Sequence, residues 1–527
     1  MSAALPAIPE PAAWNVAEPR DTLLVQAAQR LGITPLNVVM LVQELKELER
    51  PSTAELTVAD EHFTELGLAR QFILRHGGNL RYCAAWGKWL CWDGCRWCRD
   101  EIELAARWIK DTVLHFYQKH AYLKKIGNDE TAAQLFKFAV RCEAASVQAG
   151  ALKLARSEKE IALASKQLDT HRWLLNVSNG TIDLHDGRLR EHRREDMLTA
   201  MASCEFNPAA KAPRWEQFLQ EVTAGDAGLT QYLQKMAGVC LTGDVSEQVL
   251  FIVHGDGGNG KSVFLETLAG MMGPDYAGQA PPDLLMTRSS IQHPTEMAFL
   301  EGKRMVLASE TEAGCRLRLQ CVKRLTGDAT ITARRMREDF YVFDRTHKMI
   351  LQTNHRPALP ETGEAVRRRI RLVPFNVTIP REEQDKRLVD TLRQEWPGIL
   401  SWAVQGCLAW QKEGLAEPQA VLAATAGYLR DESAGRKFLA ECTTDDPGAW
   451  VECKALHQAY ITWCDRRGVS SCTPGQFYAE LRNLGFEDKS HRFGGAVKRG
   501  FPGLQLAGSG GATADDCSAV APCSAES

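Results

Sequence analysis

The sequence lacks four features, and each absence excludes a class of protein. No apolar run reaches the roughly 18 residues that a membrane-spanning helix needs, and the first residues, MSAALPAIPEPAAWN, lack the basic stretch and apolar core of a secretory signal. No segment repeats at a fixed period, which argues against a solenoid or propeller. A charge excess is also missing, because 63 basic and 66 acidic residues give a net charge of −3. This near-neutral net charge excludes a uniformly basic protein that coats nucleic acid, and it is compatible with a channel that is basic only locally.

The composition is that of a globular protein with reduced thiols. Hydrophobic residues make up 44% of the chain and charged residues 24%, which argues against disorder over most of its length. Sixteen cysteines are spread from Cys83 to Cys523 without a secretory signal, so we expect a cytoplasmic protein with no membrane anchor. In WLCWDGCRWCRD, the residues Cys91, Cys95 and Cys98 lack the paired C-x2-C spacing of a zinc site, and we interpret them as half-buried strand cysteines.

Composition and periodicity predict an α/β protein with several domains. The expected segments are a flexible leader (1–20), a mostly helical N-terminal domain with β-hairpins (21–205), an α/β core (206–380), a helical segment (381–435), a winged-helix-like domain (436–506) and a disordered tail (507–527). In the winged-helix-like domain, a helix beginning at Thr473-Pro474 precedes two strands that meet near Gly494-Gly495. The basic residues of these strands either contact phosphates or form a solvated face, and both readings stay open.

A phosphate-binding loop is the strongest chemical signal in the chain. The apolar run VLFIV (249–253) has a buried-strand pattern, and GDGGNGKS (255–262) and a helical pattern follow it. The motif G-x4-G-K-[ST] requires this strand–loop–helix context. The glycines let backbone amides turn toward phosphates, Lys261 offers a point charge, and Ser262 offers a magnesium ligand. The predicted nucleotide-binding residues are Gly255, Asp256, Gly257, Gly258, Asn259, Gly260, Lys261 and Ser262.

Polar residues follow two further strand-like runs. RMVLAS (304–309) leads into Glu310, with Glu312 two residues further on, and KMILQT (348–353) leads into Asn354. We expect one glutamate, taken as Glu310, to hold Mg²⁺ together with Ser262, and the other to orient the attacking water, although the sequence does not decide this division. Asn354 can reach the γ-phosphate or the attacking water. A solvated pair of glutamates is the plainer alternative.

Positive charge is concentrated between residues 303 and 371. This stretch holds 16 basic and 8 acidic residues, so its net charge is 16 − 8 = +8. Within it, ATITARRMREDFYVF predicts two strands that meet near residues 337–339 and bring arginines beside aromatic rings. Such a hairpin suits a sequence-tolerant track for single-stranded DNA, and a hairpin without DNA contact is the alternative. The run RRRIR (367–371) is either a surface basic run or the source of an arginine finger for a neighbouring subunit.

Five segments resemble a known family in their order and spacing. GDGGNGKS, GKRMVLASETE, CVKRLTGDATITARRM, LQTNHRP and RRRIRLVPF are similar to the superfamily 3 helicase module of phage and plasmid primase–helicases and to the related poxvirus replication NTPase. The resemblance extends upstream through NVSNGTIDL and covers roughly residues 80–380. It implies an AAA+-like P-loop NTPase core behind a helical linker domain, ATP and Mg²⁺ as cofactors, and a homo-oligomeric ring, normally hexameric, on single-stranded DNA.

The resemblance also implies roles for particular residues. Lys261 and Ser262 match the Walker A pair, Glu310 and Glu312 the acidic motif, and Asn354 the sensor. Arg369 is the most plausible arginine finger. The DNA-contacting set that the resemblance and the basic hairpin predict together is Lys323, Arg334, Arg335 and Arg337.

We therefore predict an ATP-dependent replicative DNA helicase of a phage, prophage or plasmid, acting in the cytoplasm or nucleoid of a bacterial host. Its expected partners are single-stranded and forked DNA and a separate primase or host replication proteins. A nucleotide-switched replication initiator or loader that does not unwind DNA is the main alternative, and an NTPase of mobile-element maintenance or defence is another. Fewer than about 80 residues precede the resemblance, below the roughly 100–150 of a typical domain, so primer synthesis by this chain is not expected.

Overall fold

The computed structural model describes residues 62–281, 284–287, 294–309, 315–467, 471–493 and 496–507. The predicted leader, the first part of the predicted N-terminal domain and nearly all of the predicted tail lie outside these residues. Two compact units are present, one made mainly of the chain up to His171 and the other mainly of the chain from Ala202 onward. Together they form a mixed α/β protein, as the sequence predicts.

The first unit combines a four-helix cluster with a small sheet. Asp100 accepts hydrogen bonds from the amides of Leu104 (2.8 Å) and Ala105 (3.0 Å), so its carboxylate caps the longest helix of the unit. The sheet order is β3-β2-β1-β4, and the antiparallel β2–β3 pair confirms the predicted hairpin around Asp93-Gly94. The elements of this unit are α3 (Glu65–His76), β1 (Leu80–Cys83), β2 (Lys88–Trp92), β3 (Trp97–Arg99), α4 (Leu104–Lys125), α5 (Asp129–Cys142), α6 (Ala145–Ala155) and β4 (Ala162–Leu163).

A second small sheet follows, with the strand order β5-β6-β7. Its strands are β5 (Leu174–Val177), β6 (Gly180–Asp183) and β7 (Arg188–Arg190). Gly187 has φ +75° in the turn between β6 and β7, a conformation that glycine adopts without strain. These strands confirm the hairpins predicted at Asn179-Gly180 and Asp186-Gly187.

The second unit is built on a five-stranded parallel sheet with the order β14-β8-β13-β10-β9. Its strands are β8 (Leu250–His254), β9 (Ala277–Gln279), β10 (Met305–Ser309), β13 (Lys348–Thr353) and β14 (Ile370–Pro374). Strand β8 is buried along nearly its whole length, since it lies between β13 and β14. All five strands point the same way, so their carboxyl ends share one edge of the sheet, with β8 next to the point where the strand order reverses.

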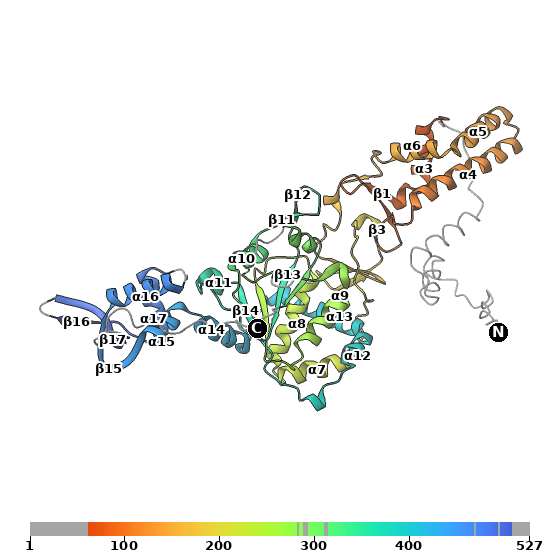
Figure 1. Ribbon diagram of the computed structural model, residues 1–527. Helices are drawn as coiled ribbons and strands as arrows, with labels where there is room; N and C mark the ends of the chain where they lie inside the picture. Colours follow the sequence, from red (N-terminus) through yellow and green to blue (C-terminus); the bar gives the residue numbers. More distant parts are fainter. Residues whose placement is uncertain are drawn as a thin grey trace, which may run out of the picture. The chain divides into compact units, whose positions relative to one another are not determined.

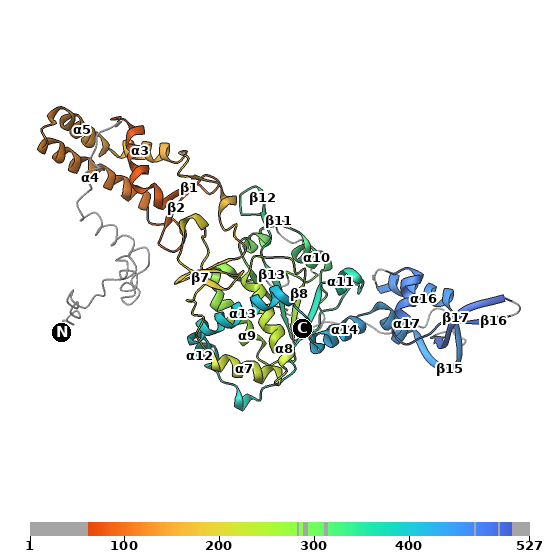
Figure 2. The ribbon, with the colours of Figure 1, turned by 180° about the vertical axis from the view of Figure 1, so that it is seen from behind.

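Helices flank this sheet, as Figures 1 and 2 show. Helices α8 and α13 approach each other at two glycines, since a Cβ on Gly238 would lie 2.1 Å from the Cys407 nitrogen and one on Gly406 would lie 2.1 Å from the Gln234 carbonyl oxygen. The helices of this part are α7 (Pro213–Thr223), α8 (Ala227–Leu241), α9 (Lys261–Tyr276), α10 (Leu319–Gly327), α11 (Glu364–Arg367), α12 (Leu388–Gln394), α13 (Trp396–Glu413) and α14 (Gln419–Asp431).

Two buried cations stabilise the opposite, amino-terminal edge of the sheet. Arg304 precedes β10 and donates hydrogen bonds to the carbonyl oxygens of Leu241 (2.5 Å) and Leu174 (2.6 Å). Lys348 begins β13 and donates to the carbonyl oxygen of Thr242, while its burial lowers its pKa to about 7. The Leu241 and Thr242 carbonyls lie at the end of α8, where a helix leaves oxygens without partners of its own, and the Leu174 carbonyl lies at the start of β5. Both cations therefore have a structural role at the edge away from the predicted phosphate-binding loop.

The chain forms a two-stranded hairpin between α10 and β13. It consists of β11 (Thr330–Arg334) and β12 (Phe340–Asp344), paired antiparallel with Arg334 opposite Phe340. Ile331 and Ala333 are buried against the core, whereas Phe340 and Val342 on the other face are each 60% exposed. This hairpin confirms the two strands predicted from ATITARRMREDFYVF.

The last part of the chain has its own hydrophobic core, which includes Phe438, Leu456, Phe477 and Phe501. Its elements are α15 (Ala434–Cys442), β15 (Thr443–Glu452), α16 (Cys453–Arg467), α17 (Pro474–Asn483), β16 (Lys489–Phe493) and β17 (Ala496–Leu506). The predicted helix at Thr473-Pro474 is confirmed as α17. Strand β15 was not predicted from the sequence, because its run TTDDPGAWVE resembles a loop. It pairs with β17 and completes a three-stranded sheet.

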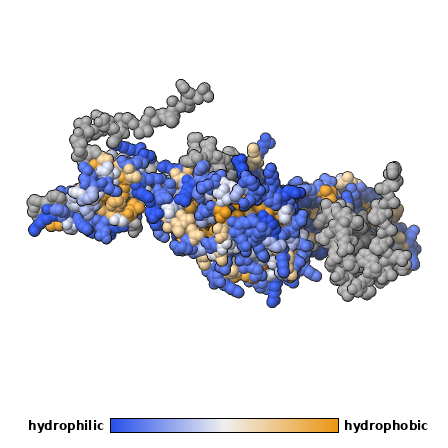
Figure 3. Space-filling model, turned by 90° about the horizontal axis from the view of Figure 1, so that it is seen from below, coloured by the Kyte–Doolittle hydropathy of each residue, from blue (hydrophilic) through white to orange (hydrophobic). Residues whose placement is uncertain are grey.

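None of the helices that the structure describes is long and apolar enough to cross a bilayer. Seen from below, the surface of the described residues is largely hydrophilic, with smaller hydrophobic areas between (Figure 3).

Candidate nucleotide and nucleic-acid site

The loop at 255–260 joins the carboxyl end of β8 to the first turn of α9. Three of its glycines have a left-handed backbone, with φ +105° at Gly257, +62° at Gly258 and +79° at Gly260. No described residue accepts a hydrogen bond from the backbone amides of 256–260. Free amides in a left-handed turn before a helix amino terminus form a concave site for an anion. The loop therefore has the backbone that phosphate binding requires.

Two glycines of the loop, Gly255 and Gly260, are required by packing. A Cβ on Gly255 would lie 2.1 Å from the Asn259 side-chain nitrogen and 2.2 Å from the Phe375 carbonyl oxygen. A Cβ on Gly260 would lie 2.5 Å from Val222 and 2.9 Å from Phe218, both on α7. Gly257, by contrast, faces open space. The loop is thus packed against α7 and the segment after β14 while one side stays open.

Lys261 and Asn259 form the polar interior of the loop. The Lys261 Nζ donates hydrogen bonds to the Gly255 carbonyl oxygen and to Asn259 Oδ1, both at 2.7 Å, and burial lowers the pKa of Lys261. Asn259 Nδ2 in turn donates to the Phe375 carbonyl oxygen at 2.9 Å. The loop closes around the ammonium group and fixes its position. Asn259 was predicted as one of the nucleotide-binding residues of the loop, and its contact with Lys261 emerges from the structure.

The segment after β14 supports the loop from the other side. The amide of Phe375 donates to the His254 carbonyl oxygen (2.8 Å), and the amide of Ile379 donates to the Gly258 carbonyl oxygen (2.9 Å). Gln384 donates to the Ile379 carbonyl oxygen (2.8 Å). The two contacts to His254 and Gly258 join residues more than a hundred positions apart in the sequence, so no local motif reveals them.

The carboxyl end of β13 reaches the loop through a residue that the sequence analysis missed. Gln352 Nε2 donates a hydrogen bond of 2.7 Å to the hydroxyl of Ser262, in the first turn of α9. Asn354, the predicted sensor, follows β13 directly and is exposed. Glu310 and Glu312 lie outside the described residues, immediately beyond the end of β10 at Ser309. The structure therefore brings the loop and the end of β13 together at one edge of the sheet.

The predicted arginine finger has an unexpected environment. Arg369 is only 8% exposed, and its guanidinium donates to the Ala365 carbonyl oxygen at 2.8 Å and lies beside Gly327. Burial, then the positive charge of Arg368, lowers its pKa. A side chain that reaches another subunit must be exposed at the surface, and Arg367 and Arg368 meet this condition.

The hairpin residues predicted to contact DNA divide into two groups. Arg334 lies over the Phe340 ring (5.6 Å to its centroid) on the exposed face, and the exposed Arg337 occupies the turn with φ +63°. Arg335 is engaged within the protein, because it forms an ion pair with Glu301 (2.6 Å) and lies 4.9 Å from the centroid of the Tyr341 ring.

Lys323, on α10, forms an ion pair with Glu361 at 2.6 Å. Both side chains are partly exposed, and such a pair is worth about 0–1 kcal/mol, so an anionic ligand can displace it. Lys323 therefore stays partly exposed to solvent, and its ion pair connects it to Glu361 and not to the hairpin.

The cysteines of the β2–β3 hairpin do not form a metal site. Cys91 and Cys98 are opposite each other across the two strands, and Cys98 Sγ donates to Asp93 at 3.1 Å. Burial raises the pKa of the Cys98 thiol to about 12, which keeps it protonated at neutral pH. In the part of the chain that the structure describes, no group of three or more His, Cys, Asp or Glu side chains could hold a metal ion.

Two family models match separate parts of the chain. Residues 69–224 match the family described as D5 N terminal like, and residues 253–369 match a family of unknown function, DUF5906. The second match begins within β8 and ends at the start of β14, so it spans the loop, the hairpin and the end of β13.

Two viral proteins are similar in sequence. "Putative helicase L207/L206" of Acanthamoeba polyphaga mimivirus is 24% identical over 345 residues, which are 60% of this chain and 35% of that protein. "Putative helicase 022R" of Frog virus 3 (isolate Goorha) is 23% identical over 264 residues, 45% of this chain and 26% of that protein. The chain thus spans about a third or less of each relative.

Among solved structures, two apo forms of the NrS-1 C-terminal region are similar. One has a TM-score of 0.45 at 10% identity and covers 83% of this chain and 99% of that chain, and the other has a TM-score of 0.41 at 11% identity and covers 84% and 100%. The family match and the viral relatives confirm the resemblance stated from the sequence motifs. The match over residues 69–224 and the two viral relatives fit a D5-like primase–helicase module.

Proposed function

We propose that this chain is an ATP-driven DNA helicase that hydrolyses ATP to move on single-stranded DNA and unwind a duplex during replication. The relatives that carry the name helicase support the general class. The observation that carries the proposal for this chain is the 255–260 loop, with amides free among the described residues and a buried lysine at the carboxyl end of a central parallel strand. We further propose that the parallel sheet is an AAA+-like P-loop core and that residues 436–506 form a winged-helix domain.

Binding of the triphosphate is assigned to the loop and the first turn of α9. The backbone amides and the α9 dipole attract the phosphates, and Lys261, held by Asn259, offsets their negative charge where it grows in the transition state. Ser262 fits a magnesium ligand because its hydroxyl is exposed at the helix amino terminus and already accepts a hydrogen bond from Gln352. We expect Ser262 and Glu310 to hold Mg²⁺, which would neutralise phosphate charge.

Activation of water is assigned to polar residues at the same edge of the sheet. Glu312 would accept a proton from the attacking water, and Asn354 would hydrogen-bond to the γ-phosphate or to that water. Gln352, through Ser262, would align the first turn of α9 with the end of β13. The proposed roles of Glu310 and Glu312 rest on their position directly after β10, in the same order as in the family that the chain resembles.

We propose a homo-oligomeric ring, which is normally hexameric in the resembled family. A ring is needed because the arginine finger comes from another subunit. Of the arginines in the 367–371 run, the exposed Arg368 suits this role better than the buried Arg369. An arginine finger stabilises charge in the transition state and is worth about 10³-fold or more in rate. The ring would also place one hairpin from each subunit near a common axis.

The hairpin is the proposed DNA track. On its exposed face Arg334 offers a cation for phosphate and Phe340 a ring for base stacking, and Met336, 78% exposed, adds apolar surface at the turn. Arg337 adds charge there, and Arg335 orients the strands through Glu301. A loader that binds DNA without moving on it needs no such combination of aromatic and cationic groups beside the ATPase core, so the hairpin favours translocation.

DNA-stimulated ATP hydrolysis tests this proposal. Purified protein is expected to hydrolyse ATP in the presence of Mg²⁺, and single-stranded DNA is expected to increase the rate. The Lys261→Ala variant serves as the control for contaminating ATPases. A rate that is the same in the variant, or no ATP binding by the wild type, would contradict the assignment of the loop.

A further inference from the structure

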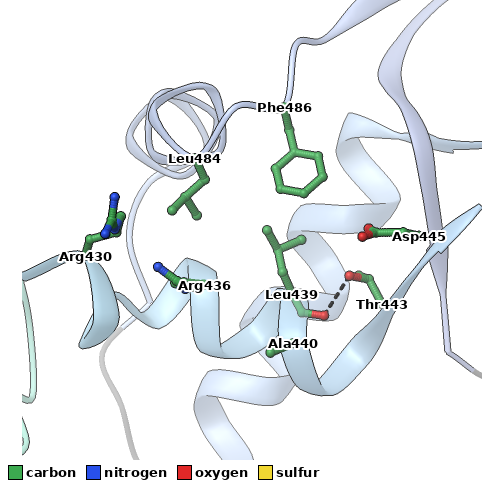
Figure 4. Close-up of a pocket in the computed structure, with 8 residues that line it drawn as sticks. All are labelled: Arg430, Arg436, Leu439, Ala440, Thr443, Asp445, Leu484 and Phe486. Carbon is green, nitrogen blue, oxygen red and sulfur yellow. Dashed lines mark hydrogen bonds between the residues drawn. The ribbon is translucent and has the colours of Figure 1, made fainter. Parts of the chain in front are cut away.

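A groove of about 600 Å³ lies between α15, the start of β15 and the end of α17. Figure 4 shows its eight labelled residues, which come from three separate stretches of chain. The lining residues are Arg430, Arg436, Leu439, Ala440, Thr443, Asp445, Leu484 and Phe486. The groove takes no part in the nucleotide site or the hairpin.

Charge is distributed unevenly along this groove. Arg430 and Arg436 lie together near one end, Asp445 lies near the other, and Leu439, Leu484 and Phe486 separate them (Figure 4). Arg436 forms an ion pair with Asp431 at 3.2 Å. The Arg430 guanidinium has no ion pair or hydrogen bond with any described residue. An occupant that matches this pattern has a carboxylate at one end and a bulky apolar group in the middle.

The wall of the groove is also the edge of a sheet. The sheet order is β15-β17-β16, so β15 has a described neighbour on one side only. The Ala507 amide donates to the Cys442 carbonyl oxygen, and the register then pairs Thr443 with Leu506 and Asp445 with Leu504. In an antiparallel ladder the hydrogen-bonding direction alternates, so the main-chain groups of Asp445 point away from β17. They are therefore placed to pair with an added strand.

We propose that this groove binds an extended peptide segment of a partner protein, in which one or two carboxylates precede a bulky apolar side chain. The carboxylates would pair with Arg430 and Arg436, the apolar side chain would pack on Leu439, Leu484 and Phe486, and the peptide main chain would add to the edge of β15. An arginine fork suits a carboxylate because it can donate two parallel hydrogen bonds.

The same groove is poorly suited to nucleic acid. Asp445 lines it, and Asp431 lies beside its arginines, so a phosphate backbone would meet negative charge along its path. An extended peptide avoids this conflict because its carboxylates are confined to one end. The observations therefore favour peptide over DNA.

Selection from a random dodecapeptide library displayed on phage, with the full chain as the immobilised target, tests the proposal. The enriched sequences are expected to share Asp or Glu shortly before Leu, Ile, Phe or Trp. Fluorescence anisotropy of one labelled enriched peptide then gives its affinity. The Arg430→Glu variant is expected to bind at least about fivefold more weakly. The Lys454→Glu variant, an equal charge change at an exposed residue outside the groove, is expected to bind as the wild type does.

Four outcomes would overturn the proposal. They are a lack of enrichment, a consensus rich in Lys and Arg, equal affinity of the Arg430→Glu variant and the wild type, and displacement of the peptide by a thymidine oligonucleotide. Removal of residues 508–527 gives a further readout, because tighter peptide binding after truncation would mean that the chain's own residues compete for the groove and would contradict a partner-protein occupant. None of these measurements depends on ATP hydrolysis, so the ATPase proposal is tested separately.

Discussion

Replacement of Gly260 by alanine is the sharpest structural test of the phosphate-binding loop. Gly260 has φ +79°, and its added Cβ would lie 2.5 Å from Val222 and 2.9 Å from Phe218 on α7. A left-handed conformation costs a non-glycine residue about 1–2 kcal/mol. Overpacking a buried contact adds about 1–3 kcal/mol. The Gly260→Ala variant should therefore lose about 2–5 kcal/mol of stability in the unit that contains the loop.

Gly257→Ala is the matched control for this prediction. Gly257 also has a positive φ, +105°, but its Cβ would face open space, so only the backbone cost applies. The difference between the two variants is the packing cost of about 1–3 kcal/mol, and a unit of more than 300 residues shifts its Tm by about 1–2 °C per kcal/mol. Gly260→Ala should therefore melt roughly 1–6 °C below Gly257→Ala.

Differential scanning calorimetry measures this difference. The protein has more than one compact unit, so the transition to follow is the one that ATP shifts to higher temperature. Gly260→Ala should lower that transition and weaken its response to ATP, because the loop can no longer rest against α7. Equal melting temperatures of the two variants would refute the inferred packing of the loop.

Three further changes test separate parts of the account. Lys261→Ala should lower ATP hydrolysis by at least about 10²-fold while the protein stays folded by circular dichroism, and hydrolysis at the parent rate would exclude the loop as the phosphate site. Alanine at Arg334 and Arg337 together should weaken single-stranded DNA binding and flatten the slope of log affinity against log salt, whereas an unchanged slope would reject the hairpin as the track. Arg368→Ala mixed with Lys261→Ala should regain part of the ATPase activity that neither has alone, and strictly additive activity in rings shown to be mixed would reject the finger assignment.

Local patterns in the sequence were sufficient to predict the elements that carry the chemistry. The loop at 255–262 lies between a buried strand and a helix, as expected, and the hairpin at 330–344 has the predicted strands. Both depend on short-range rules: glycines where φ is positive, and alternation of buried and exposed residues along a strand. These rules involve only residues that are close together in the chain, so they can be applied to the sequence without knowledge of the tertiary structure.

The sequence alone did not predict contacts between residues that are far apart in the chain. Gln352 contacts Ser262 from 90 positions away, and Asn259 reaches the Phe375 carbonyl from 116 positions away. Whether Arg369 is exposed depends on its packing beside Gly327, which the run RRRIR does not reveal. Strand β15 was missed because its acidic start and Pro447 resemble a turn, and its pairing with β17 overrides that local preference.

Strand displacement on forked DNA tests the central claim most directly. A fork with a labelled strand is incubated with the wild-type protein and Mg²⁺, either with ATP or with a non-hydrolysable ATP analogue, and the released strand is measured over time. The account predicts strand release with ATP, little release with the analogue, and none with Lys261→Ala. Stable fork binding and DNA-stimulated ATP hydrolysis without strand release would contradict it, and would favour a nucleotide-switched loader that does not unwind DNA.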